Sequence, residues 1–161
     1  MIELSDRINA MEESATIAMS RKSRELRAEG KDVITLSLGE PDFHTPDFIK
    51  EAASKAMDDN FTFYTPVPGY LDLREAISKK FKRDNGLDYS PEEIVVSTGA
   101  KQSIANVVLS LINEGDEVII PAPYWVSYLE IVKVAGGRPV LVTAGIDNDF
   151  KVSGKELEEA I

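Results

Sequence analysis

Three short apolar runs alternate with two helix-length segments between residues 93 and 142. The runs are EIVVS (93–97), EVIIP (117–121) and RPVLV (138–142). A chain that runs strand, helix, strand, helix, strand returns each time in the same direction, so its strands are parallel and its helices pack on the sheet. This repeat predicts an α/β fold built on a parallel sheet.

The sequence before this repeat predicts helices and one short strand. We expect a helix over 14–29 that ends at Gly30, a strand over 33–38, a helix that opens at 45–47 and a helix that ends at 85–86. Glycine takes a positive φ at little cost where a helix ends. A hydroxyl cap followed by proline and an acid, as in Thr45-Pro46-Asp47, suits the start of the third segment.

The last residues predict a helix without an end signal. Ser153 and Glu156 have the spacing of a capping box, and an apolar stripe that starts at Leu157 reaches Ile161 without a terminating residue. Three strands are also fewer than a stable doubly wound sheet usually has. We therefore expect a piece of a longer protein, with apolar surface that promotes oligomerisation when the rest is missing.

Charge and composition exclude several classes of partner. There are 18 lysines and arginines against 28 acids, a net charge of −10, and no block of basic residues. Nucleic acid and anionic membranes are therefore poor partners. The chain has no cysteine and one histidine, His44, which argues against a zinc site. The acidic start and the short uncharged stretch at 102–113 fit neither a signal peptide nor a membrane span, so we expect a cytoplasmic protein.

The turn STGAK (97–101) predicts an anion site. Gly99 and Ala100 are small enough for a ligand to approach the backbone, and the helix after them offers unpaired N–H groups at its positive end. Lys101 adds a cation, and the rest of that helix is uncharged and is expected to be covered on both sides in a larger body. The alternative is that Gly99 is only a turn residue.

Aromatic residues come after the second strand of the repeat and lie at the same carboxyl edge as the glycine turn, where open α/β sheets bind ligands. We expect a helix to begin near Tyr124. Trp125 could stack on a planar ring, or it could fill the core with the apolar face of that helix. Gly39 lies in a turn that could present its main chain to a substrate or be a plain turn, and Tyr64 lies in a loop.

Five motifs, in this order, resemble the amino-terminal part of class I aminotransferases that use pyridoxal 5′-phosphate, nearest the bacterial aspartate aminotransferase branch. They are SLGEPDF (37–43), FYTPVPGYLDLREAI (63–77), VVSTGAKQSI (95–104), GDEVIIPAPYWVSY (115–128) and GG (136–137). The resemblance covers almost the whole chain. It implies the fold-type I transferase fold, with an N-terminal arm and small-domain segment over 1–45 and an incomplete coenzyme-binding large domain over 46–161.

The resemblance also implies roles for single residues. Gly99, Ala100 and Lys101 would hold the coenzyme phosphate, and Trp125 would stack on the pyridine ring and border the substrate. Gly39 would offer its main chain to the substrate carboxylate.

A homodimer is implied as well, because Tyr64 would reach the phosphate bound by the neighbouring subunit. The substrates would be an amino acid, aspartate-like or related, and a 2-oxo acid.

The residues that carry out the chemistry in this family lie beyond the matched region. These are the lysine that forms the Schiff base, an aspartate on the pyridine nitrogen and an arginine for the substrate carboxylate. No NPTG, SDE, SxxK or GWR pattern occurs, and Lys101 matches the phosphate turn instead. We therefore assign no catalytic residue and expect the chain alone to be inactive. The alternatives are a C–S lyase or synthase of the same fold type, or a non-catalytic binding or assembly fragment.

Overall fold

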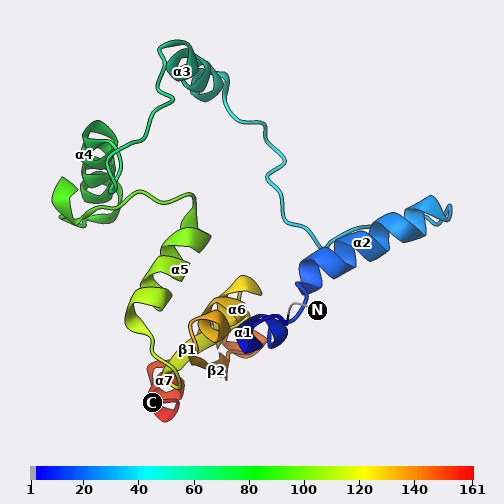
Figure 1. The fold of residues 1–161 in the computed structure, drawn as a ribbon. Helices are drawn as coiled ribbons and strands as arrows, with labels where there is room; N and C mark the ends of the chain where they lie inside the picture. Colours follow the sequence, from blue (N-terminus) through cyan, green and yellow to red (C-terminus); the bar gives the residue numbers. More distant parts are fainter. Residues whose placement is uncertain (1–2) are drawn as a thin grey trace. The chain divides into compact units, whose positions relative to one another are not determined.

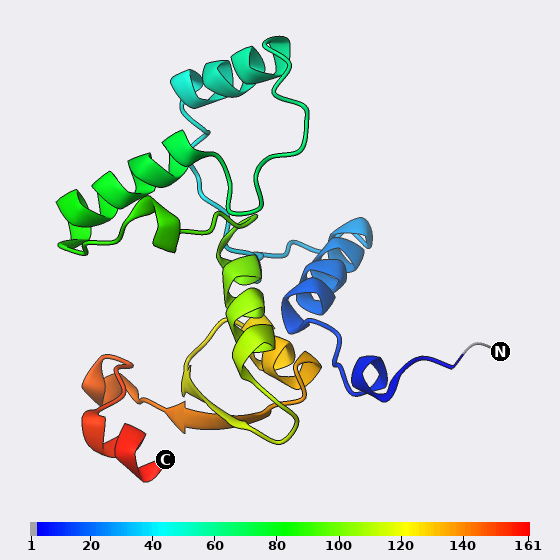
Figure 2. The same ribbon diagram turned by 60° about the vertical axis from the view of Figure 1, so that its left-hand side comes forward.

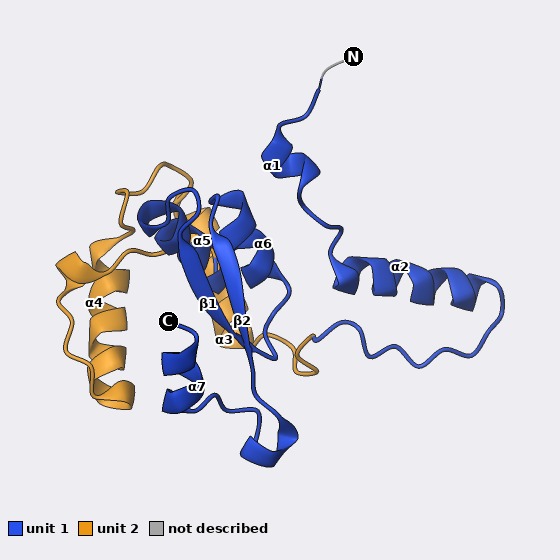
Figure 3. Ribbon diagram, turned by 90° about the horizontal axis from the view of Figure 1, so that it is seen from below, with its two compact units in different colours: residues 1–39, 99–161 blue, residues 40–98 orange. Residues whose placement is uncertain are grey.

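The computed structural model describes residues 3–161, which divide into two compact units (Figure 3). The first unit comprises the chain up to Gly39 together with Gly99–Ile161, and the second unit is Glu40–Thr98. Most candidate site residues fall in the first unit, while Tyr64 belongs to the second.

The first unit holds the sheet and the helices next to it (Figures 1 and 2). Its helices are α1 (Asp6–Asn9), α2 (Ala15–Ala28), α5 (Ala100–Leu111), α6 (Ser127–Val134), α7 (Gly154–Glu159) and the short 3₁₀ helix η3 (Ile146–Asn148); its strands are β1 (Glu117–Ala122) and β2 (Arg138–Thr143). The predicted helix over 14–29 is confirmed as α2, and Gly30 after it has φ +81°.

The sheet of the first unit consists of β1 and β2, which run parallel and pair from Glu117 opposite Arg138 to Ala122 opposite Thr143. Helix α6 connects the two strands and packs against both, and its Val132 is 2% exposed. The core of this unit is made by Val132 together with Ile120, Val142 and Ala144. The predicted β–α–β crossover is therefore confirmed for the second and third apolar runs.

The other two predicted strands do not form among the described residues. Residues 33–38 and 93–97 contain no strand. A β-strand is stabilised by hydrogen bonds to a neighbouring strand, and no described segment pairs with either run. The first run nevertheless keeps a two-residue period: Val33, Thr35 and Ser37 are half-buried, while the apolar residues between them are exposed.

The second unit is built from helices α3 (Asp47–Asp58) and α4 (Leu71–Lys80), a π-helical turn η1 (Phe81–Asn85) that continues α4, and a 3₁₀ turn η2 (Pro91–Glu93). Gly86 ends the α4 segment with φ +68°, as predicted. The predicted cap at Thr45 is wrong: α3 begins at Asp47 after Pro46, and no side chain caps it. The apolar face of α3 does form, but Ile49 and Met57 on it are exposed.

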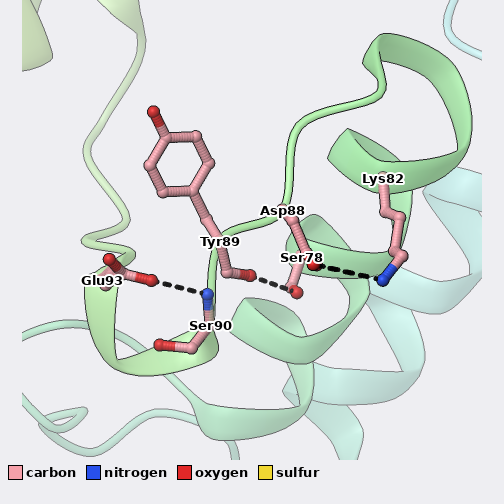
Figure 4. A network of polar contacts seen from close by, with 6 residues as sticks. All are labelled: Ser78, Lys82, Asp88, Tyr89, Ser90 and Glu93. Carbon is pink, nitrogen blue, oxygen red and sulfur yellow. Dashed lines mark hydrogen bonds and ion pairs between the residues drawn. The ribbon is translucent and has the colours of Figure 1, made fainter.

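Polar contacts join α4 to the segment after it (Figure 4). The Ser78 hydroxyl donates to the Tyr89 carbonyl at 2.6 Å, and the Lys82 ammonium lies 3.2 Å from the Asp88 carboxylate. The Ser90 amide donates to the Glu93 carboxylate at 2.8 Å, which closes the capping box of η2. These contacts hold residues 88–93 along the α4 segment.

Candidate functional site

Gly99 forms the turn into α5, and its backbone conformation requires glycine. Its φ is +89°, whereas a Cβ atom built on it would meet nothing within 4 Å, so conformation rather than crowding selects the residue. The amides of Gln102 and Ser103 donate to the Gly99 carbonyl at 3.1 and 3.3 Å. The amides of Ala100 and Lys101 come earlier in the turn and have no acceptor within the helix.

The charge distribution around this helix start favours an anion. No acidic residue lies in the first turn of α5, and Lys101, the second residue of the helix, carries a positive charge. Helix N-termini carry a partial positive charge, which adds to that of the ammonium group. The amides of Ala100 and Lys101, the helix dipole and the lysine charge are together suited to a phosphate-like group.

Trp125 lies beside the Lys101 side chain. The Lys101 Nζ atom is 5.0 Å from the centroid of the Trp125 ring, within the range of a cation–π interaction. The predicted helix start near Tyr124 is too early, because α6 begins at Ser127 and Trp125 precedes it. Of the two alternatives for Trp125, a core role is excluded within the described chain, because the residue is 41% exposed.

A shallow depression of about 460 Å³ adjoins Trp125 at the carboxyl end of β1. It is lined by Ile120, Pro121, Pro123, Tyr124, Trp125 and Tyr128. Aromatic and apolar walls suit a flat ring, while Lys101 and the start of α5 suit a charged oxygen group. Together these groups fit pyridoxal 5′-phosphate, which is a planar ring that carries a phosphate ester.

None of the contacts described above includes Gly39 or Tyr64. Gly39 is exposed, and nothing lies within 4 Å of the Cβ position built on it. Tyr64 belongs to the second unit, and its side chain is fully exposed. Their expected roles therefore stay predictions.

Sequence reasoning missed a second pocket of the first unit, about 480 Å³ in volume, between the segment 11–15 and helices α5 and α6. The Glu12 amide donates to the Glu130 carboxylate at 3.4 Å, and Lys133 Nζ lies 2.9 Å from the same carboxylate group. The hydrogen bond to Glu130 raises the pKa of Lys133. No local pattern predicts this pocket, because Glu12 and Glu130 are far apart in the sequence.

A metal site and a membrane-spanning helix are both absent from residues 3–161. No group of three or more His, Cys, Asp or Glu side chains in this part of the chain could hold a metal ion. None of its helices combines the length and the apolar character needed to cross a bilayer.

Comparison with known proteins agrees with the geometry of the site. Residues 31–161 match the family model for aminotransferase class I and II. A probable aspartate/prephenate aminotransferase of Rickettsia bellii is 55% identical over 158 residues, which are 98% of this chain and 40% of the relative. An aspartate aminotransferase of Geobacillus stearothermophilus is 51% identical over 160 residues, 99% of this chain and 41% of the relative.

Solved structures show the same similarity. The aspartate aminotransferase from Rhizobium meliloti matches with a TM-score of 0.95 and 42% identity, over 100% of this chain and 40% of that protein. The Thermus thermophilus enzyme with maleate matches with a TM-score of 0.93 and 45% identity, over 100% of this chain and 42% of that protein. The chain thus spans about 40% of the length of the curated relatives it matches. The family model, which covers most of the sequence, shows that the chain belongs to the class I and II aminotransferases.

Proposed function

We propose that this chain is the amino-terminal part of an aminotransferase that exchanges an amino group between an aspartate-like amino acid and a 2-oxo acid with the help of pyridoxal 5′-phosphate. The observation that carries the proposal is the helix start at Ala100 and Lys101, whose amides have no acceptor within α5, with Lys101 Nζ 5.0 Å from the exposed Trp125 ring. Relatives named for aspartate and prephenate, and a neighbour solved with the dicarboxylate maleate, support acidic substrates.

The residues of this chain would bind and orient the coenzyme. The amides of Ala100 and Lys101 bind the phosphate, and the φ of Gly99 holds the turn that aims them. Trp125 orients the ring by stacking and borders the substrate, and the Gly39 main chain receives the substrate carboxylate. When bound, the coenzyme supplies an electron sink that stabilises negative charge at the substrate Cα.

The wider organisation belongs to the same proposal. The parent protein is a cytoplasmic homodimer in which Tyr64 of one subunit serves the phosphate site of the other. The fully exposed side chain of Tyr64 supports this role, because a buried hydroxyl could not reach a second subunit. Residues 1–45 form the arm and small-domain segment, and residues 46–161 form part of the coenzyme-binding domain. The Schiff-base lysine comes from outside this chain.

The test uses the protein encoded by the whole reading frame that contains this chain. The purified protein is titrated with pyridoxal 5′-phosphate and then given aspartate and 2-oxoglutarate. We expect a new absorbance band on titration and equal amounts of oxaloacetate and glutamate as products. Release of ammonia without glutamate would instead assign a lyase of the same fold type, and no spectral change at all would refute the proposed coenzyme site.

A further inference from the structure

We propose that Arg74 is a positioning residue for the loop that carries Tyr64, the residue expected to reach the coenzyme phosphate of the partner subunit, an inference that rests on the proposed function. Arg74 touches no candidate ligand group. Its guanidinium instead ties the loop after Tyr64 to Pro91 of the same unit, and it thereby limits where Tyr64 can lie.

The guanidinium of Arg74 spans two carbonyl groups that are distant in sequence. Its Nε donates to the Gly69 carbonyl at 3.2 Å, and its Nη1 donates to the Pro91 carbonyl at 2.7 Å. The side chain is half-buried, and no ion pair with an acid is recorded for it among residues 3–161. Arginine suits this arrangement because its planar fork directs several N–H donors at fixed angles, whereas a lysine ammonium acts as a point charge.

The two segments that Arg74 ties together also contact each other directly. The Val96 amide donates to the Pro68 carbonyl at 3.0 Å. Gly69 has φ +96°, and a Cβ atom built on it would lie 2.9 Å from Val96 Cγ2, closer than real Cβ contacts. The loop before α4 therefore fits against residue 96 with no space for a side chain at position 69.

The packing between these segments bears on the proposed phosphate site because the loop that it fixes carries Tyr64. Pro66, whose carbonyl accepts from the Gly69 amide at 2.8 Å, is two residues after Tyr64. A loop that is fixed against residues 91–96 limits where the Tyr64 side chain can lie within the second unit. In the proposed dimer, this loop would serve the partner's phosphate site.

A simpler role for Arg74 would be to stabilise α4 alone. Other contacts already hold the segment after α4 along that helix: the Ser78 hydroxyl binds the Tyr89 carbonyl, and Lys82 pairs with Asp88 (Figure 4). Arg74 adds to these contacts the bond to Gly69, which lies in the loop before α4. The hydrogen bond from Arg74 to the Gly69 carbonyl thus fixes the loop before α4. A role of Arg74 in positioning this loop is therefore distinct from a role in stabilising the helix.

The test compares coenzyme binding with and without the phosphate group. The full-length apoprotein is titrated with pyridoxal 5′-phosphate and with pyridoxal, and the ratio of the two dissociation constants measures the contribution of the phosphate. The variants are Arg74→Ala, Arg74→Lys and Gly69→Ala. The matched control is Arg83→Ala, an exposed arginine of the same unit that pairs only with Asp84 in the recorded contacts. The melting temperature of each apoprotein is measured in parallel.

We expect the preference for the phosphorylated coenzyme to fall by roughly tenfold in Arg74→Ala, because two hydrogen bonds from a charged donor are lost. Gly69→Ala should lower it as well, Arg74→Lys should give an intermediate value, and Arg83→Ala should match the wild type. An Arg74→Ala preference equal to that of the wild type overturns the inference alone. If Arg74→Ala does not fold, unchanged preferences in Arg74→Lys and Gly69→Ala overturn it. A wild-type protein that does not prefer the phosphorylated coenzyme overturns the proposed function, and the inference with it.

Discussion

The exposed indole of Trp125 offers a ring-shaped ligand apolar surface to cover. Apolar surface in contact with water costs about 25 cal/mol per Å², and an aromatic side chain offers a large area of it. Trp125 leaves 41% of its surface exposed next to a lysine ammonium. A flat ligand that covers the ring recovers this free energy and also meets the cation with its negative groups.

Replacing Trp125 should therefore affect binding more than folding. In the full-length protein we expect Trp125→Ala to weaken pyridoxal 5′-phosphate binding about tenfold, from lost stacking and area. The melting temperature should fall by no more than about 2 °C, because the side chain is only partly buried. Titration and calorimetry measure the two effects. Tyr89→Ala, at another exposed aromatic, is the control, and an unchanged affinity in Trp125→Ala would contradict the stacking role.

Sequence reasoning at the residue scale succeeded where a local rule decides the conformation. Gly99 was expected to make the turn before a helix, and its φ of +89° is one that glycine adopts without a steric penalty. The sequence left open whether Trp125 fills the core or stacks on a ligand, because exposure depends on which distant residues cover a side chain. Helical periodicity places a residue on a face without showing what that face contacts.

At the scale of elements, helix α7 shows a local signal that the structure confirms. The Ser153 hydroxyl and amide both donate to the Glu156 carboxylate at 2.7 Å, and the Glu156 amide donates to the Ser153 hydroxyl oxygen at 3.2 Å. The bonds to the carboxylate favour its ionised form and lower the pKa of Glu156, first through the Ser153 side chain and then through its backbone. All of these bonds lie within four residues, so the sequence alone was sufficient to predict them.

The lowered pKa of Glu156 predicts acid sensitivity of α7. Because the folded pKa lies below the unfolded one, the cap stabilises the helix above the usual glutamate pKa of about 4.3 and is lost as pH falls through the folded value. We expect residues 154–159 to lose helical chemical shifts in that acid range. In Glu156→Gln, the amide oxygen can still accept these bonds but does not titrate, so the pH dependence should vanish. Ser153→Ala should return the Glu156 pKa toward its usual range, and a wild-type Glu156 that titrates normally would contradict the argument.

Strands were harder to predict than helices for a physical reason. A helix satisfies its backbone hydrogen bonds within one segment, so the helices that cover 15–28 and 100–111 could be predicted from local signals. A strand needs a partner, and only the runs at 117–121 and 138–142 have one among the described residues. The run at 33–38 has strand periodicity without pairing, which indicates that its sequence suits a sheet that these residues do not complete.

At the scale of the whole molecule, exposed apolar surface dominates. The first unit's sheet has only two strands among the described residues. Helix α5 is largely apolar and has no acidic side chain, yet none of its residues is buried. Val107, Leu109 and Leu111 are all more than half exposed. Surfaces of this kind in a soluble protein normally contact another part of the protein or another chain. By the coverage of about 40%, the relatives are about two and a half times as long as this chain.

The isolated 161-residue chain should therefore self-associate. In size-exclusion chromatography with light scattering we expect a mass well above the 17.7 kDa of one chain, rising with concentration, and binding of an apolar dye such as anilinonaphthalene sulfonate. Changing Val107 and Leu111 together to glutamate places charges on the exposed side of α5 and should shift the population toward the monomer. The matched control introduces two glutamates at exposed, uncharged polar positions elsewhere in the first unit, Ser5 and Thr143, so that the added charge is the same. A wild-type chain that stays monomeric, binds no dye and unfolds cooperatively would show that the apolar face of α5 needs no cover, because a two-stranded sheet and a small core would then be sufficient for a stable fold.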